Sequence, residues 1–526
     1  MRTAEVRAIV RGAVLVLGLF MAASHAGAFE VEKYREAVEK RVHELNDSVQ
    51  EGPYRAEWAS LEEYNEAPEW FRDAKLGIYF HWGVYSVPAF GSEWYPRHMH
   101  LKDRPEYKHH AKTYGEPTEF GYHDFVSRFG ADNFDADRWA TLFEEAGARF
   151  AGPVAEHHDG FSMWDSEVTP WNAADRGPKR DIAGLLADAV RERGMRFIAT
   201  FHHARNNLWK KNGEWTGHYS GVKKNFPSLL ENPELHMLYG YMPREQFLDF
   251  WLAKLKEVVD QYQPSLVWFD SWLDEVPESY QKRYLAYFYN SADKWGKDVV
   301  VTRKQDDLPL EVSVEDYEKG RADRLTERPW LTDDTISKGS WCYTEGLKIK
   351  SLNTVLDTFI DIVSKNGVLL LNISPKADGT IPERQKKVLR GLGDWLDRNG
   401  EAIYGTRPWK TFGEGPTRLE KGGHFVGHLE YTASDVRFTR SKDGHTLYAI
   451  LLDWPGTNER VTMKSVSADN LPNGVQIEDV SILGHEGDID WKMTGDGLAV
   501  TMPGTAIEDR AVALKLEATG PVMVDN

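Results

Sequence analysis

Polar side chains that could take part in chemistry follow several short apolar runs of the chain. His81 comes after one run, His157 and His158 after a second, His202 after a third and Asp270 after a fourth. A neutral imidazole can both donate and accept a hydrogen bond, which suits the recognition of hydroxyl groups. A carboxylate can attack an electrophilic carbon and stabilise a nearby positive charge. These residue types suit the hydrolysis of a sugar.

Asp270 is the candidate nucleophile because it ends the apolar run 266–269. Trp268 lies two positions earlier and would share its face in a strand, so the carboxylate would stand beside an aromatic wall. The alternative is a solvated Asp that caps a following helix. Attack on an anomeric carbon also requires a second carboxyl group to protonate the leaving oxygen. The candidates near a later strand end are Glu311, Glu315 and Glu318.

The histidines also raise the question of a metal. They occur as adjacent pairs, His157-His158 and His202-His203, and no His-Glu-x-x-His motif is present. Neighbours in an extended strand point to opposite faces, so such pairs chelate poorly. We therefore expect neither a metal nor another cofactor. A metal-dependent barrel hydrolase remains an alternative.

The elements that would position these residues alternate between strand and helix. Five apolar strand ends carry His, Asp or Arg, including Arg303 after the run 299–301. This alternation over residues 57–409 predicts an α/β fold with a (β/α)8-like barrel, whose strand ends meet at one face. The expected strands are 77–80, 150–154, 197–201, 266–269, 299–301 and 368–373.

The sequence on either side of this barrel has a different pattern of residues. Residues 29–56 are charged and predict a helical lead-in. Residues 410–526 contain short alternating runs separated by Gly, Asp and Asn turns, which predict an antiparallel β-sandwich.

Composition limits the partners and the location. The formal net charge of −18 disfavours nucleic acid, and the single cysteine allows no internal disulfide. Three arginines, an apolar run and the sequence Ala26-Gly27-Ala28 predict a signal peptide over residues 1–28. We expect a protein exported to the periplasm or the medium, with no membrane span. Oligomeric state is not indicated.

Four stretches together resemble the α-L-fucosidases of glycoside hydrolase family 29. The likeness is carried by residues 75–88 with 92–95, by 157–161 with Trp164, by 267–270, and by 364–373 continuing to 382. The resemblance implies a retaining exo-hydrolase that removes terminal α-linked L-fucose from glycans through a covalent fucosyl-enzyme.

The resemblance also implies roles for individual residues. Asp270 is similar to the family's nucleophile, and Glu318 is our choice of acid/base over Glu315. Trp341 matches an aromatic residue that packs on the fucose methyl group. The other implied substrate-binding residues are His81, Glu93, Trp94, His157, His158, His202, Trp268 and Arg303.

The sequence also departs from the family pattern. Glu156 stands where a lysine is common, Ser271 where a glycine commonly follows the nucleophile, and His202-His203 where a tyrosine is often found. A barrel that binds fucosylated glycans without cleaving them is therefore a second alternative. A change of sugar, for example to galactose, is a third.

Overall fold

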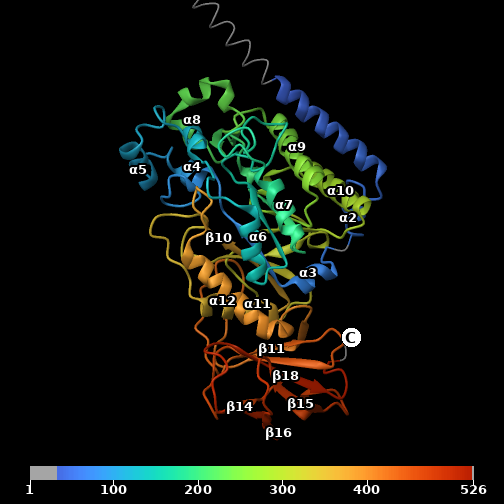
Figure 1. Cartoon of the computed structure of the whole chain (residues 1–526). Helices are drawn as coiled ribbons and strands as arrows, with labels where there is room; N and C mark the ends of the chain where they lie inside the picture. The colour runs from blue at the N-terminus through green and yellow to red at the C-terminus, as the bar shows by residue number, and fades with distance from the viewer. Residues whose placement is uncertain (1–31, 65, 524–526) are drawn as a thin grey trace, which may run out of the picture.

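The computed structural model describes residues 32–64 and 66–523. The predicted signal peptide, residues 1–28, lies outside the described residues, so export stays a prediction. The described chain begins with a helix over residues 32–51. Figure 1 shows this helix lying along α10 (Glu278–Trp295) and α9 (Arg244–Tyr262), at the end of the molecule opposite the C-terminal sheets.

Eight parallel strands close into a barrel, which confirms the predicted fold class. Their spatial order is β1-β10-β9-β8-β7-β6-β3-β2. Two of them, β8 and β9, were not predicted. The strands are β1 (Leu76–Phe80), β2 (Phe150–Glu156), β3 (Arg196–Phe201), β6 (Leu266–Phe269), β7 (Val300–Arg303), β8 (Val314–Asp316), β9 (Trp330–Thr335) and β10 (Gly367–Ile373).

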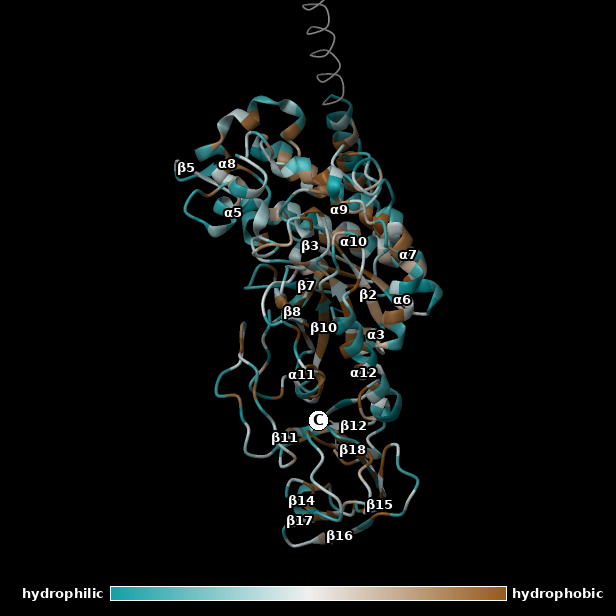
Figure 2. Ribbon diagram, turned by 60° about the vertical axis from the view of Figure 1, so that its left-hand side comes forward, coloured by the Kyte–Doolittle hydropathy of each residue, from teal (hydrophilic) through white to brown (hydrophobic). Residues whose placement is uncertain are grey.

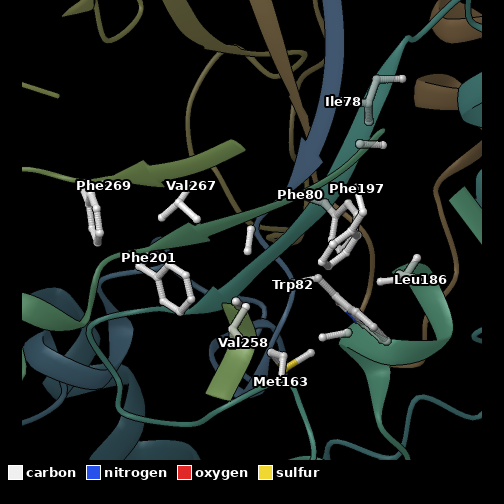
Figure 3. Packing of buried hydrophobic residues seen from close by; sticks show 14 of the residues in the cluster. Ile78, Phe80, Trp82, Met163, Leu186, Phe197, Phe201, Val258, Val267 and Phe269 are labelled. Atoms are coloured by element: carbon white, nitrogen blue, oxygen red, sulfur yellow. The ribbon is translucent and has the colours of Figure 1, made fainter. Parts of the chain in front are cut away.

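Alternation along each strand divides the apolar residues between two cores. In β6, Leu266 and Trp268 point into the barrel interior, whereas Val267 and Phe269 belong to the core between strands and helices. Figure 3 shows Val267 and Phe269 in the outer core together with Val258 of α9. Successive side chains of a strand face opposite ways, so a polar residue two positions after Trp268 is directed to the barrel mouth.

Amphipathic helices cover the outside of the barrel. Asp135 and Asp181 cap the first turns of α6 and α7 by accepting hydrogen bonds from backbone N–H groups, and Gly296 ends α10 in the left-handed conformation. Figure 2 shows apolar colour in the central strands, such as β10. The remaining long helices are α6 (Ala136–Glu145), α7 (Ile182–Glu192), α11 (Leu352–Ser364) and α12 (Glu383–Asn399).

Two antiparallel sheets follow the barrel and enclose a second hydrophobic core, as the sequence predicts. The five-stranded sheet has the order β11-β12-β13-β18-β15 and the three-stranded sheet β14-β17-β16. The strands are β11 (Arg407–Glu414), β12 (Val436–Arg440), β13 (Thr446–Leu451), β14 (Arg460–Met463), β15 (Ile477–Ile482), β16 (Asp490–Thr494), β17 (Gly497–Thr501) and β18 (Val512–Ala518).

A buried charge cluster joins the barrel to the five-stranded sheet. Asp361 of α11 accepts hydrogen bonds from Arg437 Nε of β12 and from Lys365 Nζ, both at 2.7 Å, and lies 3.6 Å from Arg321 Nε. Figure 1 shows α11 lying directly over β11. The Asp361 carboxylate therefore balances the charges of cations from the barrel and from the five-stranded sheet.

Within the described part of the chain, no helix combines the length and the apolar character needed to cross a membrane.

We predict that Asp361→Ala destabilises the protein strongly. The change leaves buried cations without their carboxylate, which costs about 3–5 kcal/mol in comparable cases. Thermal and urea melts followed by circular dichroism measure this loss. The matched control is Glu383→Ala on α12, whose ion pair with Lys386 is exposed and contributes little. Equal melting of both variants would contradict the prediction.

Candidate active site

A cavity of about 390 Å³ opens where the barrel strands end. Its volume falls within the about 300–1,000 Å³ of ligand pockets, near the lower limit. Ten of the twelve site residues predicted from the sequence line it, although they come from distant parts of the chain. These ten are His81, Glu93, Trp94, His157, His158, His202, Trp268, Asp270, Glu318 and Trp341.

Asp270 stands at the centre of the contacts in this cavity. Its backbone N–H donates to the carbonyl of Phe201, which continues the pairing of β6 with β3 past the strand end. Its Oδ2 lies 3.2 Å from both His158 Nε2 and His202 Nδ1, and its Oδ1 lies 3.2 Å from Lys304 Nζ. The carboxylate is thus fixed by three side chains from three strand ends.

Lys304 is a buried cation among four carboxyl groups. Its Nζ lies 3.2 Å from Asp270 Oδ1 and 3.2 Å from Glu318 Oε2. The same nitrogen is 3.5 Å from Asp333 Oδ2 and 3.7 Å from Asp316 Oδ2. Burial lowers the pKa of this lysine, but the surrounding carboxylates outweigh burial and raise it well above its ordinary value. Lys304 therefore stays charged.

The pKa values of the two carboxyl groups on Lys304 are displaced in opposite directions. Burial raises the pKa of Asp270, but Lys304 and His202 hold it well below its ordinary value, so this group is ionised. Burial is also the largest influence on Glu318, and with the charges of Asp333 and Asp270 it raises the pKa of Glu318 to about 7 despite Lys304. Two neighbouring carboxyl groups with such different pKa values are expected where one acts as a base or nucleophile and the other as an acid.

The histidines present ring nitrogens to the cavity. His81 is oriented by Asn372, whose Oδ1 lies 2.9 Å from its Nδ1, and His158 Nδ1 contacts the carbonyl of His202. Burial lowers the pKa of His81 and His157 well below the ordinary value, and that of His158 to about 4, so these rings are neutral. His157 Nδ1 and His202 Nε2 are buried without a hydrogen-bond partner among the described residues. Such atoms are available to hydroxyl groups of a ligand.

Aromatic side chains complete the walls. Trp341 packs against His81 with ring centroids 5.3 Å apart, and its backbone N–H donates to Glu93 Oε2 at 3.0 Å. On another wall, Trp94 lies beside His158 and Trp272, with centroids 5.1 and 5.9 Å away. These contacts hold the flat aromatic faces in fixed positions.

Arg303 and Glu315, the other two predicted residues, are absent from the described lining of the cavity. They bind each other: Arg303 Nε donates to Glu315 Oε2 at 3.0 Å, and its Nη1 donates to the carbonyl of Leu308 at 2.6 Å. The expectation that Arg303 contacts substrate is therefore not supported by its position. The next residue, Lys304, faces the cavity instead.

Several lining residues were missed from the sequence. Lys304 was visible only as part of a strand end, while Asp333 lies in the unpredicted strand β9 and accepts a hydrogen bond from Tyr79 Oη at 3.0 Å. Trp272 has a φ of 77°, a left-handed conformation that is unusual for a bulky residue. Phe425 comes from beyond the barrel, and no pattern in the sequence connects it to the cavity.

Glu156 precedes the histidine pair and stands where the sequence pattern commonly has a lysine. Its side chain faces away from this cavity. Its carboxylate accepts from Lys254 Nζ of α9 at 2.7 and 2.8 Å and from Ser162 Oγ at 2.6 Å. Both partners of this ion pair are about 1 % exposed. The acidic residue on the strand is therefore neutralised by a lysine on the packed helix.

Comparison with known proteins bears directly on this site. The family profile described as "Alpha-L-fucosidase" matches residues 42–401, and "Alpha-L-fucosidase C-terminal domain" matches residues 430–517. The chain belongs to the α-L-fucosidase family. It is therefore a glycoside hydrolase.

Relatives within this family cover nearly the whole chain. Tissue alpha-L-fucosidase of Rattus norvegicus is 31% identical over 88% of this chain and 92% of its own, and that of Homo sapiens is 31% identical over 86% and 88%. The crystal structure of Thermotoga maritima alpha-fucosidase in complex with fucose is 30% identical. It superposes with a TM-score of 0.68 over 88% of this chain and 100% of its own.

Two groups of side chains in this fucosidase-family site have a geometry that could hold a metal ion. In the first group, His81, His157 and His202 each offer one ring nitrogen, and these atoms lie within 4.8 Å of one another. In the second group, one nitrogen each from His158 and His202 and one carboxylate oxygen of Asp270 lie equally close together. Convergence of different strands brings them together, which the adjacent pairs in the sequence did not reveal. Lys304, however, already neutralises Asp270 and repels a second cation.

We predict that activity does not depend on a metal ion. Dialysis against EDTA should leave kcat on an aryl α-L-fucoside unchanged, because Lys304 and neutral imidazoles supply the site's charge and hydrogen bonds. Plasma mass spectrometry of the purified protein should find only substoichiometric zinc. Loss of activity in EDTA that zinc restores would instead support a metal-dependent hydrolase.

Proposed function

We propose that this protein is a retaining exo-α-L-fucosidase that releases terminal α-linked L-fucose from glycans. The observation that carries the proposal is the contact of one lysine, Lys304, with two carboxyl groups: Asp270, which is ionised, and Glu318, whose pKa is raised to about 7. Double displacement requires one nucleophile and one acid at such a spacing.

In the first step, Asp270 attacks the anomeric carbon of the fucosyl unit. The bond from that carbon to the glycosidic oxygen breaks, and the proton of Glu318 moves to this leaving oxygen. A fucosyl ester on Asp270 forms as the leaving sugar departs. The pKa of Glu318, raised to about 7, keeps its proton available up to neutral pH.

In the second step, Glu318 acts as the base. It takes a proton from water, the resulting hydroxide attacks the anomeric carbon, and the ester bond to Asp270 breaks. L-fucose leaves with its original anomeric configuration. Glu318 has regained its proton and Asp270 its charge.

The shared contact with Lys304 keeps Asp270 and Glu318 close together. Asp270 Oδ1 and Glu318 Oε2 each lie 3.2 Å from the same nitrogen, so they can be separated by no more than twice that distance. Inverting enzymes place their carboxyl groups about 6.5–9.5 Å apart to admit a water molecule, and retaining enzymes about 5–5.5 Å. This upper limit, which applies to the two oxygens nearest Lys304, is compatible with the retaining spacing.

The remaining lining suits a deoxy sugar. His81, His157, His158 and His202 offer ring nitrogens to hydroxyl groups, and Trp341 offers an apolar face to the methyl group of fucose. Galactose would place a hydroxymethyl group against that face, which disfavours it. The fucose complex of the Thermotoga maritima relative and its complex with a mechanism-based inhibitor support the same substrate and mechanism here.

We predict that Asp270→Asn lowers kcat by about 10⁴-fold, because the amide cannot attack the anomeric carbon. Release of fucose from an aryl α-L-fucoside measures the loss, and an unchanged thermal melt shows that the fold is intact. An intact variant with near-normal activity would disprove the assignment. Wild-type protein that binds fucosylated glycans but releases no fucose would instead support a binding protein.

We predict that Glu318→Ala lowers kcat by about 10²–10⁴-fold on poor leaving groups. Azide should restore turnover of an activated aryl fucoside and give the fucosyl azide of retained configuration, seen by NMR. The control is Glu315→Ala, whose side chain binds Arg303 outside the cavity. If only the Glu315 variant loses activity and responds to azide, the assignment to Glu318 is wrong.

We predict that kcat/KM falls as the pH rises through about 7, because Glu318 must be protonated in the first step. Lys304 lowers the pKa of both Asp270 and Glu318, so Lys304→Met should move both limbs of the pH profile to higher pH. The control is Lys386→Met on the outer helix α12, which should leave both limbs in place. A Lys304 variant with unchanged limbs would contradict this reading.

A further inference from the structure

We propose that Phe425 is the platform on which the leaving sugar of the substrate packs, so that the segment 422–428 forms the aglycone subsite. The inference rests on the proposed function, because it takes Glu318 as the acid that protonates the glycosidic oxygen. The segment lies beyond the barrel, in the loop between β11 and β12.

Phe425 is unusual among the described residues for its exposure. The residue is 63% exposed, and Leu185 is the other exposed large hydrophobic residue in the part of the chain that the structure describes. Phe425 nevertheless lines the cavity that holds Asp270 and Glu318. Its φ is 54°, a conformation that costs free energy for a bulky residue and persists where the surroundings enforce it. An exposed aromatic ring held at the mouth of a sugar site suits contact with a pyranose face.

Hydrogen bonds fix this ring to the segment that carries the proposed acid. The Phe425 N–H donates to the carbonyl of Glu318 at 2.7 Å, and the Glu318 N–H donates to His424 Nδ1 at 3.0 Å. Arg321 and Gly423 exchange two further backbone hydrogen bonds of 3.2 and 3.0 Å. The backbone of Phe425 is therefore bound directly to the backbone of Glu318, which places the ring beside the proposed acid.

Close packing and a buried carboxylate hold the rest of the loop. A Cβ atom on Gly320 would lie 2.0 Å from the carbonyl oxygen of Gly423, so only glycine allows this approach. At the far end, Asp435 accepts hydrogen bonds from the N–H groups of Thr417 and Thr432 at 2.8 and 2.9 Å. Loops as long as 415–435 without regular structure are uncommon and are usually functional.

The chemistry of the reaction determines what must lie at Phe425. The leaving oxygen takes its proton from Glu318, so the leaving sugar stands on the Glu318 side of the cavity, where Phe425 is fixed. A second hollow of about 250 Å³ shares Phe425 and is lined by polar residues that include Lys319, Lys338 and Lys350. A longer glycan can therefore continue past the ring. The ligand class is a pyranose joined to fucose.

The test compares substrates that differ only in the leaving group. Phe425→Ala should lower kcat/KM about tenfold for the α-L-fucosyl disaccharide that the wild type cleaves best, since an aromatic contact of this kind is lost. It should leave kcat/KM for α-L-fucosyl fluoride, which has no leaving sugar, within about twofold of wild type. Phe425→Tyr should retain the wild-type rate on both, and Leu185→Ala on α7 serves as the surface control.

Binding measurements separate this inference from the proposed function. In the Asp270→Asn background, Phe425→Ala should weaken binding of the same disaccharide about tenfold and leave binding of free L-fucose unchanged, by isothermal titration calorimetry. Equal losses on fluoride and disaccharide would show that Phe425 acts only through Glu318 and would overturn the proposal. Unchanged disaccharide cleavage and binding would also overturn it. A wild type that cleaves neither substrate would refute the proposed function instead.

Discussion

The chemistry of this site depends on one buried cation. Lys304 stands among Asp270, Asp316, Glu318 and Asp333, and four ionised carboxylates around a single ammonium would leave a large uncompensated negative charge in a buried place. Protons on Asp316, whose pKa burial and Asp333 raise well above its ordinary value, and on Glu318 relieve that charge. Asp270, which also contacts two histidines, stays ionised. The balance of charge around Lys304 thus favours an ionised Asp270, the proposed nucleophile, and a proton on Glu318, the proposed acid.

The barrel makes this arrangement possible because it brings the ends of parallel strands to one face. Six of these eight strands, and the polar residues at the ends of several of them, could be predicted from the sequence. β1, β2, β3 and β6 are mostly apolar and are followed by polar residues, a pattern typical of strands buried on both faces. β8 has three residues and β9 includes Asp333 and Asp334, so neither reads as a buried strand, and Asp333 was missed with them.

The sequence predicts which strand ends carry functional residues better than it predicts which of two nearby residues faces the cavity. Arg303 is the last residue of β7 and Lys304 follows it, so a shift of one residue along the strand decides which of the two faces the cavity, and composition does not reveal that shift. Glu318 was preferred to Glu315 from the sequence, and the ion pair of Glu315 with Arg303 removes the competitor from the described lining. Glu156 was recognised as a departure, but its partner Lys254 lies on a helix almost a hundred residues away, and only the fold brings them together.

The loop that fixes Phe425 to Glu318 has a consequence for biosynthesis. The last barrel strand ends at Ile373, so all eight barrel strands are synthesised before residues 415–435. The backbone of Glu318 therefore acquires the partners that His424 and Phe425 supply only after the chain beyond the barrel has been made. Completion of the site becomes a late event in synthesis, coupled to the C-terminal sheets whose strands flank the loop. Products that end before residue 415 would lack these partners of Glu318.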